Sequence, residues 1–319
     1  MTLNEKVLLV GAGPMAIDYA KILAALNTDV VVIGRGQASA SAFTEKTGIA
    51  AMTGGLSAYL GMAADVPASA IVAVGVEALA ESTLQLLRHG VRRILLEKPG
   101  ALTGLEIREI QTLAAEKNAD VFIAYNRRLY ASTLKAQEII EADGGVQSMH
   151  FEFTEWNHVI RNLPKADGVK EAWLLGNSTH VIDLAFYLGG TPIEWQAFTG
   201  GGLDWHPAAS IFSGAGRTDC GVLFSYQANW DAPGRWGVEV ITANSRLIFR
   251  PMESLQIMRK GSVAIESVPI DNALDQEFKP GLHEQVRRFL VNDLASFCTL
   301  AEQVEKWEIY TKIAGYPPT

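Results

Sequence analysis

The stretch VLLVGAGPMAIDYA, residues 7–20, decides the fold of the first part of this chain. A short apolar run leads into Gly11, Gly13 and Ala16, which have the spacing G-x-G-x-x-A, and a segment with helical periodicity follows. In such a unit the first glycine allows a tight turn, the second lets the backbone approach a pyrophosphate, and the third small residue lets the helix pack on the strand. Because the motif lies between a predicted strand and a predicted helix, it indicates a dinucleotide-binding turn rather than a plain glycine turn.

The alternation of apolar strand and helix continues as far as residue 125. Strands that are apolar at every position and alternate with helices are typical of a parallel sheet covered on both faces. We therefore predict an α/β fold in which residues 1–125 form a Rossmann dinucleotide-binding domain. The strand-like runs after the first are DVVVIG at 29–34, AIVAVGV at 70–76, RRILLEKP at 92–99 and DVFIAYN at 120–126.

The pattern changes in the second part of the chain. All seven tryptophans lie beyond residue 150, and runs such as SMHFEFTEW (148–156) and GVLFSYQANW (221–230) alternate apolar and polar residues. This alternation predicts a mostly antiparallel, open sheet with one solvated face. We expect residues 126–319 to form an α+β domain for substrate binding and oligomerisation. A helix is predicted over 281–299, and the last helix is expected to pack back on the N-terminal domain.

Composition excludes several classes of protein. The net charge is −8 and the sequence has no block of Lys and Arg, so a nucleic-acid partner is not expected. Cys220 and Cys298 are far apart, and no apolar run is long enough for a bilayer or begins like a signal peptide. We expect a cytoplasmic protein without a membrane partner. The six histidines are scattered, so no metal site is predicted.

The end of the second strand bears on the choice of cofactor. A site for NAD usually has an acidic residue here to hold the ribose hydroxyls. This chain has Gly34 and Arg35 instead, with Ser39 and Ser41 close behind. A guanidinium pairs well with a 2′-phosphate, so we predict NADP in preference to NAD. The alternative is that Arg35 stacks on the adenine or points to solvent.

Four segments together resemble the Gfo/Idh/MocA oxidoreductase family, over nearly the whole length of the chain. The resemblance implies a dehydrogenase or reductase that transfers hydride between a nicotinamide cofactor and a hydroxyl or carbonyl of a sugar, cyclitol or similar derivative. The segments are GAGPMA at 11–16, EKPGALT at 97–103, YNRRLY at 125–130 and STHVIDLAFYLGG at 178–190.

The resemblance also implies roles for individual residues. Lys98 would contact the reacting hydroxyl, where an ammonium stabilises a developing alkoxide or passes on its proton, and His180 would act as an acid or base. Glu97 would pair with the nicotinamide side of the cofactor, and Pro99 would shape the turn, with a cis bond. The alternative reading of EKP is a surface Glu–Lys pair. The predicted cofactor-binding residues are Gly11, Gly13, Pro14, Met15, Ala16, Gly34, Arg35, Glu97, Lys98 and Asn126; the predicted substrate-binding residues are Lys98, Arg128, Asn177 and His180.

The sequence departs from the family pattern around the histidine. Four residues before His180, where the family has an aspartate, this chain has Gly176, and Asn177 is neutral. We therefore expect His180 to be a weaker base than the family pattern implies, and we expect Asp183 to be structural. A second departure follows the fourth strand, where Glu77 and Ala80 replace the usual polar residues. A lone histidine on a helix is also compatible with a purely structural role.

Other charged and aromatic residues allow two readings. Arg127 and Arg128 suit an anionic substrate, such as a uronate or a nucleotide-linked sugar, or an interdomain salt bridge. Aromatic residues on Gly-rich loops can stack on sugars, although core or subunit-interface roles are more common for them. The second-domain candidates of this kind are Asp204, Trp205, His206, Arg235 and Trp236.

Two other functions remain compatible with these residues. One is an NAD-dependent glycoside hydrolase of the same fold, and the other is a dinucleotide-sensing regulator without catalysis. Because an open sheet leaves one face to cover, we expect a homodimer or homotetramer.

Overall fold

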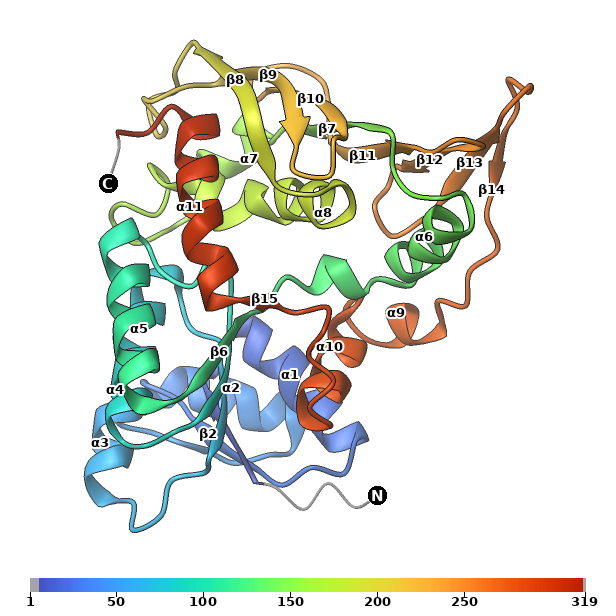
Figure 1. Cartoon of the computed structure of the whole chain (residues 1–319). Helices are drawn as coiled ribbons and strands as arrows, with labels where there is room; N and C mark the ends of the chain where they lie inside the picture. Colours follow the sequence, from blue (N-terminus) through green and yellow to red (C-terminus); the bar gives the residue numbers. More distant parts are fainter. Residues whose placement is uncertain (1–5, 318–319) are drawn as a thin grey trace. The chain divides into compact units, whose positions relative to one another are not determined.

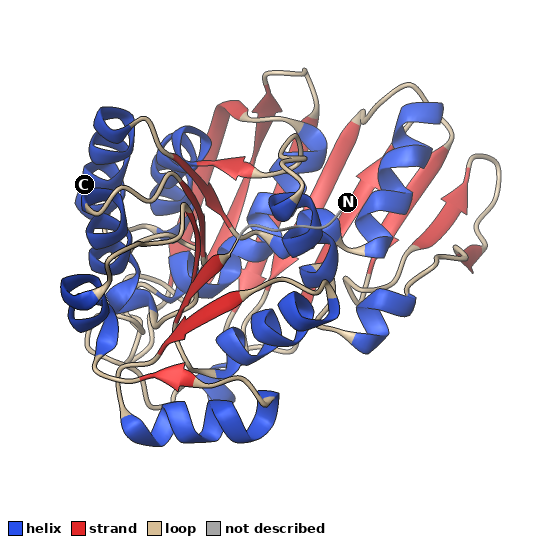
Figure 2. Ribbon diagram, turned by 90° about the horizontal axis from the view of Figure 1, so that it is seen from below, coloured by secondary structure: helices blue, strands red, loops and turns tan. Residues whose placement is uncertain are grey.

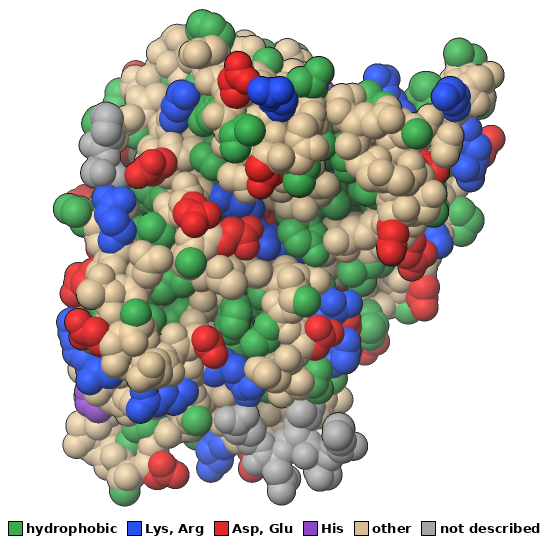
Figure 3. All heavy atoms as spheres, in the orientation of Figure 1, with side chains coloured by type: hydrophobic (Ala, Val, Ile, Leu, Met, Phe, Trp, Pro, Cys, Tyr) green, Lys and Arg blue, Asp and Glu red, His purple; other side chains and the backbone are tan. Residues whose placement is uncertain are grey.

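The computed structural model describes residues 6–317, which divide into two compact units (Figure 1). The N-terminal unit contains residues 6–125 and the later segment Leu282–Glu305. The C-terminal unit contains Asn126–Gly281 and residues 306–317. No helix within the described residues is both long and apolar enough to cross a membrane. On the face drawn in Figure 3, acidic and basic side chains of the described residues are interspersed.

The N-terminal unit has the predicted Rossmann architecture. Within residues 6–317 its sheet has the strand order β15-β6-β5-β4-β1-β2-β3, and β1 to β6 pair in parallel. Strands β1 and β4 are buried at every position, as expected for central strands covered on both faces. The strands are β1 (Val7–Val10), β2 (Val30–Ile33), β3 (Ala51–Met52), β4 (Ser69–Val72), β5 (Arg93–Leu96), β6 (Asp120–Ile123) and β15 (Cys298–Thr299); the helices between them are α1 (Pro14–Ala25), α2 (Gln37–Thr47), α3 (Gly55–Met62), α4 (Val76–Arg88) and α5 (Gly104–Lys117).

Local signals set the ends of α5, the helix that follows the EKP segment. Thr103 accepts a hydrogen bond from the backbone N–H of Glu106, and the Glu106 carboxylate accepts one from the backbone N–H of Thr103. This reciprocal capping box satisfies two N–H groups that the helix itself leaves without partners. Asn118 ends the helix in the left-handed region, with φ 49°. The helix therefore begins at Gly104, five residues after Pro99.

The C-terminal unit contains the predicted open sheet. Its strand order within the described residues is β14-β13-β12-β11-β7-β10-β9-β8, and every pair is antiparallel except β7 with β10. Figure 2 shows its strands side by side in one layer. The strands are β7 (Ser148–Phe153), β8 (Pro192–Gly200), β9 (Ile211–Thr218), β10 (Leu223–Asn229), β11 (Trp236–Ile241), β12 (Ser245–Phe249), β13 (Gln256–Arg259) and β14 (Ile265–Ser267).

Burial alternates along the strands of this sheet. The inward side chains of β7 and β10, including Phe151, Phe153 and Tyr226, are almost completely buried, while their neighbours face outward. The Phe151 ring stacks on Tyr226 with ring centres 5.3 Å apart and meets Phe186 of α8 edge-on at 5.4 Å. This aromatic layer binds α8 to the inner face of the sheet. The helical segments are η1 (Asn126–Leu129), α6 (Ala131–Ala142), α7 (Asn157–Ile160), η2 (Leu174–Ser178), α8 (Thr179–Gly189) and α9 (Ala273–Glu277).

The helix predicted over 281–299 is shorter than expected. Helix α10 spans Leu282–Leu290, and the chain then turns at Asn292, which has φ 60°. Asparagine tolerates this left-handed conformation, which a helix cannot continue. The following residues form β15, an antiparallel edge strand on β6, before α11 (Leu300–Ala314) begins. The apolar periodicity of VRRFLVNDLASFC concealed this turn.

A buried ion cluster lies inside the C-terminal unit. The Asp183 carboxylate on α8 accepts hydrogen bonds from Nε and Nη2 of Arg128 at 2.8 and 2.6 Å, and from Nζ of Lys306 on α11 at 3.0 Å. These side chains are 1%, 3% and 3% exposed. Burial alone raises the pKa of Asp183, but the Arg128 and Lys306 charges outweigh it and hold the pKa below its usual range.

We predict that Asp183→Asn destabilises the protein by about 3–5 kcal/mol, because it leaves two buried cations without their counter-charge. Since the folded-state pKa of Asp183 is depressed, its stabilisation is present above the unfolded-state pKa and is lost as the pH falls through the folded-state pKa. Urea unfolding at a series of pH values measures both effects. The exposed Asp167→Asn variant is the control, and equal unfolding midpoints for the two variants would contradict the prediction.

Candidate functional site

The glycine turn between β1 and α1 requires its first glycine. Gly11 has φ 127°, and a Cβ at this position would overlap the carbonyl oxygen of Ala73 at the end of β4. The Gly11 N–H donates to the carbonyl of Ile33 at the end of β2, at 2.8 Å. The turn therefore lies against two neighbouring strand ends. Only a residue without a side chain fits there.

The second glycine of the turn faces open space. A Cβ on Gly13 would meet no protein atom within 4 Å. Gly13 is the N-cap of α1, makes no side-chain cap hydrogen bond, and precedes Pro14 at the first helical position. The first turn of α1 therefore has no side-chain cap, and a helix N-terminus of this kind attracts phosphate oxygens. The uncapped helix end and the open space beside Gly13 fit the pyrophosphate of a dinucleotide.

The end of β2 carries the residues predicted to select the cofactor. Arg35 is exposed, and its carbonyl accepts from the N–H of Gly54 at 3.3 Å. The Gly34 N–H donates to Met52 at 2.7 Å, which fixes the loop to β3. Ser39 donates its hydroxyl hydrogen to the carbonyl of Gly36 at 3.0 Å. The loop thus presents one guanidinium and no acidic side chain over residues 34–41.

The EKP segment follows β5, two strands away from β1 in the same sheet. The phenol of Tyr19 on α1 donates to Oε1 of Glu97 at 2.8 Å, and both side chains are buried. The Lys98–Pro99 peptide bond is cis, as predicted. The buried amide of Gln303 donates to the Pro99 carbonyl at 2.9 Å. Hydrogen bonds from two different helices therefore hold the residues on either side of Lys98, which itself is half-buried.

Sequence reasoning missed Tyr19 as part of this site. Burial first, and then the charge and hydrogen bond of Glu97, raise the pKa of Tyr19 well above its usual value, so the phenol remains a protonated donor at neutral pH. Tyr19 lies in the quoted motif, three residues after Ala16. An apolar helix face containing one tyrosine is the available signal, because a buried tyrosine needs a hydrogen-bond partner. Its partner lies 78 positions away along the chain.

The polar residues of the YNRRLY segment make different contacts within the C-terminal unit. Asn126 donates its side-chain amide to the Pro280 carbonyl at 2.9 Å and is 5% exposed. Arg128 is 2% exposed, and its guanidinium is bound to Asp183. The prediction that Arg128 binds substrate is therefore not supported, because a bidentate buried ion pair already occupies its donors.

A buried glutamate lies beside the histidine helix. Oε1 of Glu155, just after β7, accepts hydrogen bonds from Nδ2 of Asn177 at 2.9 Å and from Oγ of Ser178 at 2.8 Å. Glu155 is 2% exposed, and burial raises its pKa above the usual range although the two hydrogen bonds oppose this shift. Since the Asn177 amide nitrogen is turned to Glu155, its carbonyl oxygen points elsewhere and can accept a hydrogen bond.

Glu155 was not predicted from sequence. The strand run SMHFEFTEW was interpreted only for its alternation, although a glutamate two residues beyond the last inward phenylalanine continues on the buried side. The donors to Glu155, Asn177 and Ser178, lie in a π-helical turn, η2, which includes Gly176 and leads directly into α8. The carboxylate that the family pattern has on this helix is thus absent from position 176, but another carboxylate reaches the next two residues from β7.

His180 is half-buried and lies near the ring of Trp236 on β11, with ring centres 6.3 Å apart. The same indole lies under the guanidinium groups of Arg127 and Arg235, at 4.7 and 4.9 Å from its centre. The predicted acid–base residue and two arginines therefore surround one aromatic side chain. Glu155 is also close enough to influence the pKa of Arg127.

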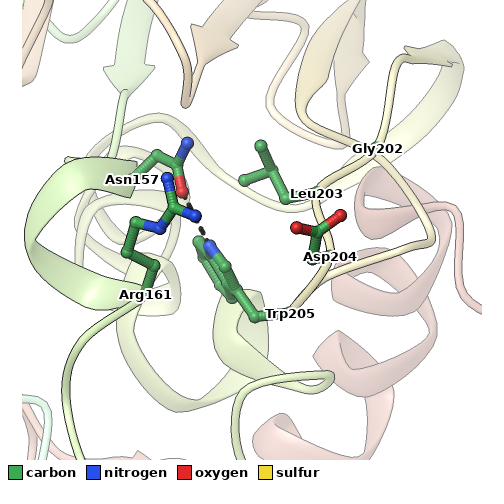
Figure 4. A pocket seen from close by; sticks show the side chains of 6 residues that line it. All are labelled: Asn157, Arg161, Gly202, Leu203, Asp204 and Trp205. Atoms are coloured by element: carbon green, nitrogen blue, oxygen red, sulfur yellow. Dashed lines mark hydrogen bonds between the residues drawn. The ribbon is translucent and has the colours of Figure 1, made fainter.

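Of the remaining aromatic candidates, His206 belongs to the core. It is 0% exposed and bonds to Ala209 and Tyr316. Trp205 stacks on Trp230, with ring centres 5.8 Å apart, and donates to Oδ1 of Asn157 at 2.7 Å. Figure 4 shows the adjoining cavity, of about 320 Å³, in which the Arg161 guanidinium lies beside Asn157 and the Asp204 carboxylate lies on the opposite side.

The predicted residues thus fall into two groups. The N-terminal unit holds Gly11, Gly13, Pro14, Met15, Ala16, Gly34, Arg35, Glu97 and Lys98 around the ends of β1, β2 and β5. The C-terminal unit holds Asn126, Arg128, Asn177 and His180, and of these Asn177 and His180 lie on consecutive turns of η2 and α8.

We predict that Tyr19→Phe lowers the free energy of unfolding by about 1.5–3 kcal/mol, because the buried Glu97 carboxylate loses a hydrogen-bond donor. The same change should weaken dinucleotide binding, since Glu97 is predicted to contact the cofactor. Chemical denaturation and calorimetric titration measure the two effects. Tyr59→Phe in the same unit is the control; if Tyr19→Phe behaves like it, the hydrogen bond does not support the site.

Comparison with known proteins identifies the N-terminal domain. Residues 5–125 match the family described as the oxidoreductase family with an NAD-binding Rossmann fold, Gfo/Idh/MocA. No curated protein matches the chain significantly.

Solved structures share the fold over nearly the whole chain. UDP-N-acetylglucosamine 3-dehydrogenase from Acidithiobacillus ferrooxidans is 14% identical, with a TM-score of 0.76 and 98% of each chain covered. Levoglucosan dehydrogenase in complex with NADH and levoglucosan is 19% identical, with a TM-score of 0.79, and the match covers 97% of this chain and 96% of that chain. An NAD-binding oxidoreductase from Klebsiella pneumoniae is 16% identical, with a TM-score of 0.76 and coverages of 98% and 96%. The N-terminal domain, residues 5–125, is therefore similar to the Gfo/Idh/MocA family of oxidoreductases with an NAD-binding Rossmann fold, and the solved structures share the fold of nearly the whole chain.

Proposed function

We propose that this protein is an NAD(P)-dependent dehydrogenase or reductase that acts on a hydroxyl or carbonyl of a sugar or sugar derivative. The observation that carries the proposal is the hydrogen bond between Tyr19 and Glu97. It joins the helix of the dinucleotide turn directly to the residue before Lys98. A phosphate-binding turn and a positioned ammonium group are thereby built into one unit, which is what a hydride-transfer site requires.

In this proposal, separate residues bind the cofactor, act as acid or base, and bind the substrate. Gly11, Gly13 and the first turn of α1 would hold the pyrophosphate, and Glu97 would contact the nicotinamide end. When bound, the nicotinamide supplies the hydride donor or acceptor. Lys98 stabilises negative charge on the substrate oxygen or exchanges its proton, and His180 serves as a second acid–base residue. The outward carbonyl of Asn177 accepts a hydrogen bond from a substrate hydroxyl.

Names of the structural neighbours support the substrate class. One neighbour is described as acting on UDP-N-acetylglucosamine, and another is described with levoglucosan and NADH bound. Both substrates are carbohydrates. We therefore propose a carbohydrate substrate here.

For the cofactor, we propose NADP as the preferred form and NAD as the second. The family description and the neighbours named with NADH favour NAD. The loop after β2, however, has the exposed Arg35 and no carboxylate over residues 34–41. A cation in this position favours the 2′-phosphate, whereas a carboxylate would repel it.

We further propose a cytoplasmic homodimer or homotetramer. Cys220 is an exposed thiol and Cys298 a buried thiol, which suits a reducing compartment. The outer face of β8, β9 and β10 carries exposed Phe198 and Leu223 among small polar residues, and a second subunit would cover it. Light scattering after size-exclusion chromatography measures the assembly.

The activity is tested with a panel of neutral, amino, acidic and nucleotide-linked sugars, with NADP and NAD, by absorbance of the reduced cofactor. We expect turnover with at least one sugar, and we expect Lys98→Met to lower kcat by about 10²–10⁴-fold, since it removes the acid–base group while the turn remains. Lys117→Met on the same unit is the control. Dinucleotide uptake without any turnover would indicate the regulator, and glycoside cleavage without net reduction would indicate the hydrolase.

Cofactor preference is tested with Arg35→Ala. We expect KM for NADP to rise about 10–100-fold with little change for NAD, the effect of losing one charge-assisted hydrogen bond. The exposed Arg92→Ala variant of the same unit is the control. If Arg35→Ala alters both cofactors equally, Arg35 does not read the 2′-phosphate.

A further inference from the structure

Two guanidinium groups share one tryptophan in the C-terminal unit. The central carbon of Arg127 lies 4.7 Å from the centre of the Trp236 ring, and that of Arg235 lies 4.9 Å from it. Arg235 also lies 4.7 Å from the ring of Trp156, and Arg127 lies 5.6 Å from the ring of Tyr130. A guanidinium that stacks on an aromatic face keeps its N–H donors at the edge available for other partners.

Within the described part of the chain, these two arginines have no carboxylate partner of their own. Among residues 6–317, neither guanidinium has a carboxylate oxygen within 4.0 Å. Nε of Arg127 is buried and makes no hydrogen bond within this described part of the chain. Burial lowers the pKa of Arg127, and the charge of Arg235 lowers it further, whereas Tyr130, Glu253 and Glu155 raise it. The fold therefore holds two like charges near each other with incomplete compensation.

Neighbouring arginines show that the unit can pair its cations. Arg128, the next residue in the chain, is bound to Asp183 at 2.6 Å. Arg250 is bound to Glu152 at 3.0 Å, and the other oxygen of Glu152 accepts from the backbone N–H of Arg235. The Arg235 side chain is thus next to a carboxylate but is directed onto two indole rings instead. This arrangement costs electrostatic energy unless an anion joins it.

Among residues 6–317, the buried carboxylate near the two arginines is that of Glu155, and it is hydrogen-bonded to other side chains. Glu155 receives its hydrogen bonds on Oε1 from Asn177 and Ser178, and neither arginine is within ion-pair distance. Its charge offsets part of the field of Arg127 and Arg235 without occupying their donors. The two fork-shaped donor sets remain suited to a planar carboxylate or to phosphate oxygens.

The arginine pair adjoins both the histidine and an open cavity. His180 lies 6.3 Å from the same Trp236 ring. Trp156, which contacts Arg235, also lines a cavity of about 280 Å³ together with Asn157, His158 and Trp230. His180 and the two guanidinium groups therefore lie around the same indole ring, and Arg235 also contacts a tryptophan that lines the cavity.

We propose that Arg127 and Arg235, held on Trp236, form a subsite for an anionic group on the substrate: the carboxylate of a uronate or the phosphate of a nucleotide-linked or phosphorylated sugar. This deepens the function proposed above and rests on it for the reaction itself. The subsite selects the substrate by charge, and the hydride transfer itself belongs to the function proposed above.

The test measures binding by calorimetry to the full chain saturated with NADP. The probes are D-glucuronate, with D-glucose as its neutral counterpart, and UDP-N-acetylglucosamine, with N-acetylglucosamine as its neutral counterpart. We expect at least one anionic probe to bind at least tenfold more tightly than its counterpart, and the arm in which this occurs identifies carboxylate or phosphate. Arg235→Ala should abolish that preference, and retained binding of NADP shows that the variant is folded. Arg235→Gln serves as the second variant, and Arg217→Ala, an exposed arginine on β9, as the control.

Equal affinities for charged and neutral probes would overturn the proposal, and so would a preference that survives in Arg235→Ala. The proposed function fails separately, if the chain binds no dinucleotide or reduces none with any sugar. Turnover of neutral sugars alone would support the proposed dehydrogenase function and contradict the anionic subsite.

Discussion

The candidate site depends on one close approach, that of the β1–α1 turn to the end of β4. At Gly11 the chain passes so near the carbonyl of Ala73 that no side chain fits. This contact fixes where α1 begins, and the direction of α1 in turn carries Tyr19 to Glu97. The position of Lys98 therefore follows from packing that begins at a glycine 87 residues earlier. A change that loosens the turn would loosen the predicted catalytic turn as well.

In the C-terminal unit, the arginines differ in whether a carboxylate pairs with them. Arg128, Lys306 and Asp183 are buried together and satisfy one another, which is how a protein interior tolerates ions. Arg127 and Arg235 lie on the face of Trp236, and the nearby buried Glu155 is hydrogen-bonded to Asn177 and Ser178. Two consecutive arginines in the sequence thus have different surroundings. The difference lies in which of them α8 can reach with an aspartate.

The departure at Gly176 has a different meaning in three dimensions. Along the sequence, it removes a carboxylate from the helical face that carries His180. In the fold, Glu155 comes from β7 and bonds to Asn177 and Ser178, so the segment that precedes His180 still contains a buried acid. The acid orients the Asn177 amide and leaves the amide carbonyl for another partner. The local Asp–His pair is absent, and a long-range contact from Glu155 reaches the residues next to Gly176.

The sequence by itself was enough to predict what depends on local periodicity and on single backbone constraints. The Rossmann unit followed from apolar strands and the spacing of Gly11, Gly13 and Ala16, and the open sheet followed from the alternation in β7 and β10. The cis bond before Pro99 came with the family resemblance. These features were predictable because each depends on residues a few positions apart or on a short motif.

Only the tertiary structure decided which side chains meet. The partners of Arg128, Glu155 and Tyr19 lie 55, 22 and 78 positions away, and no periodicity links them. The turn at Asn292 lies within an apolar pattern that resembles a continuous helix. It likewise depends on a long-range contact, the pairing of β15 with the edge of β6. Hydrogen bonds and ion pairs of this kind depend on how the layers pack. The sequence therefore shows which chemical groups are present, and only the tertiary structure shows which of them are in contact.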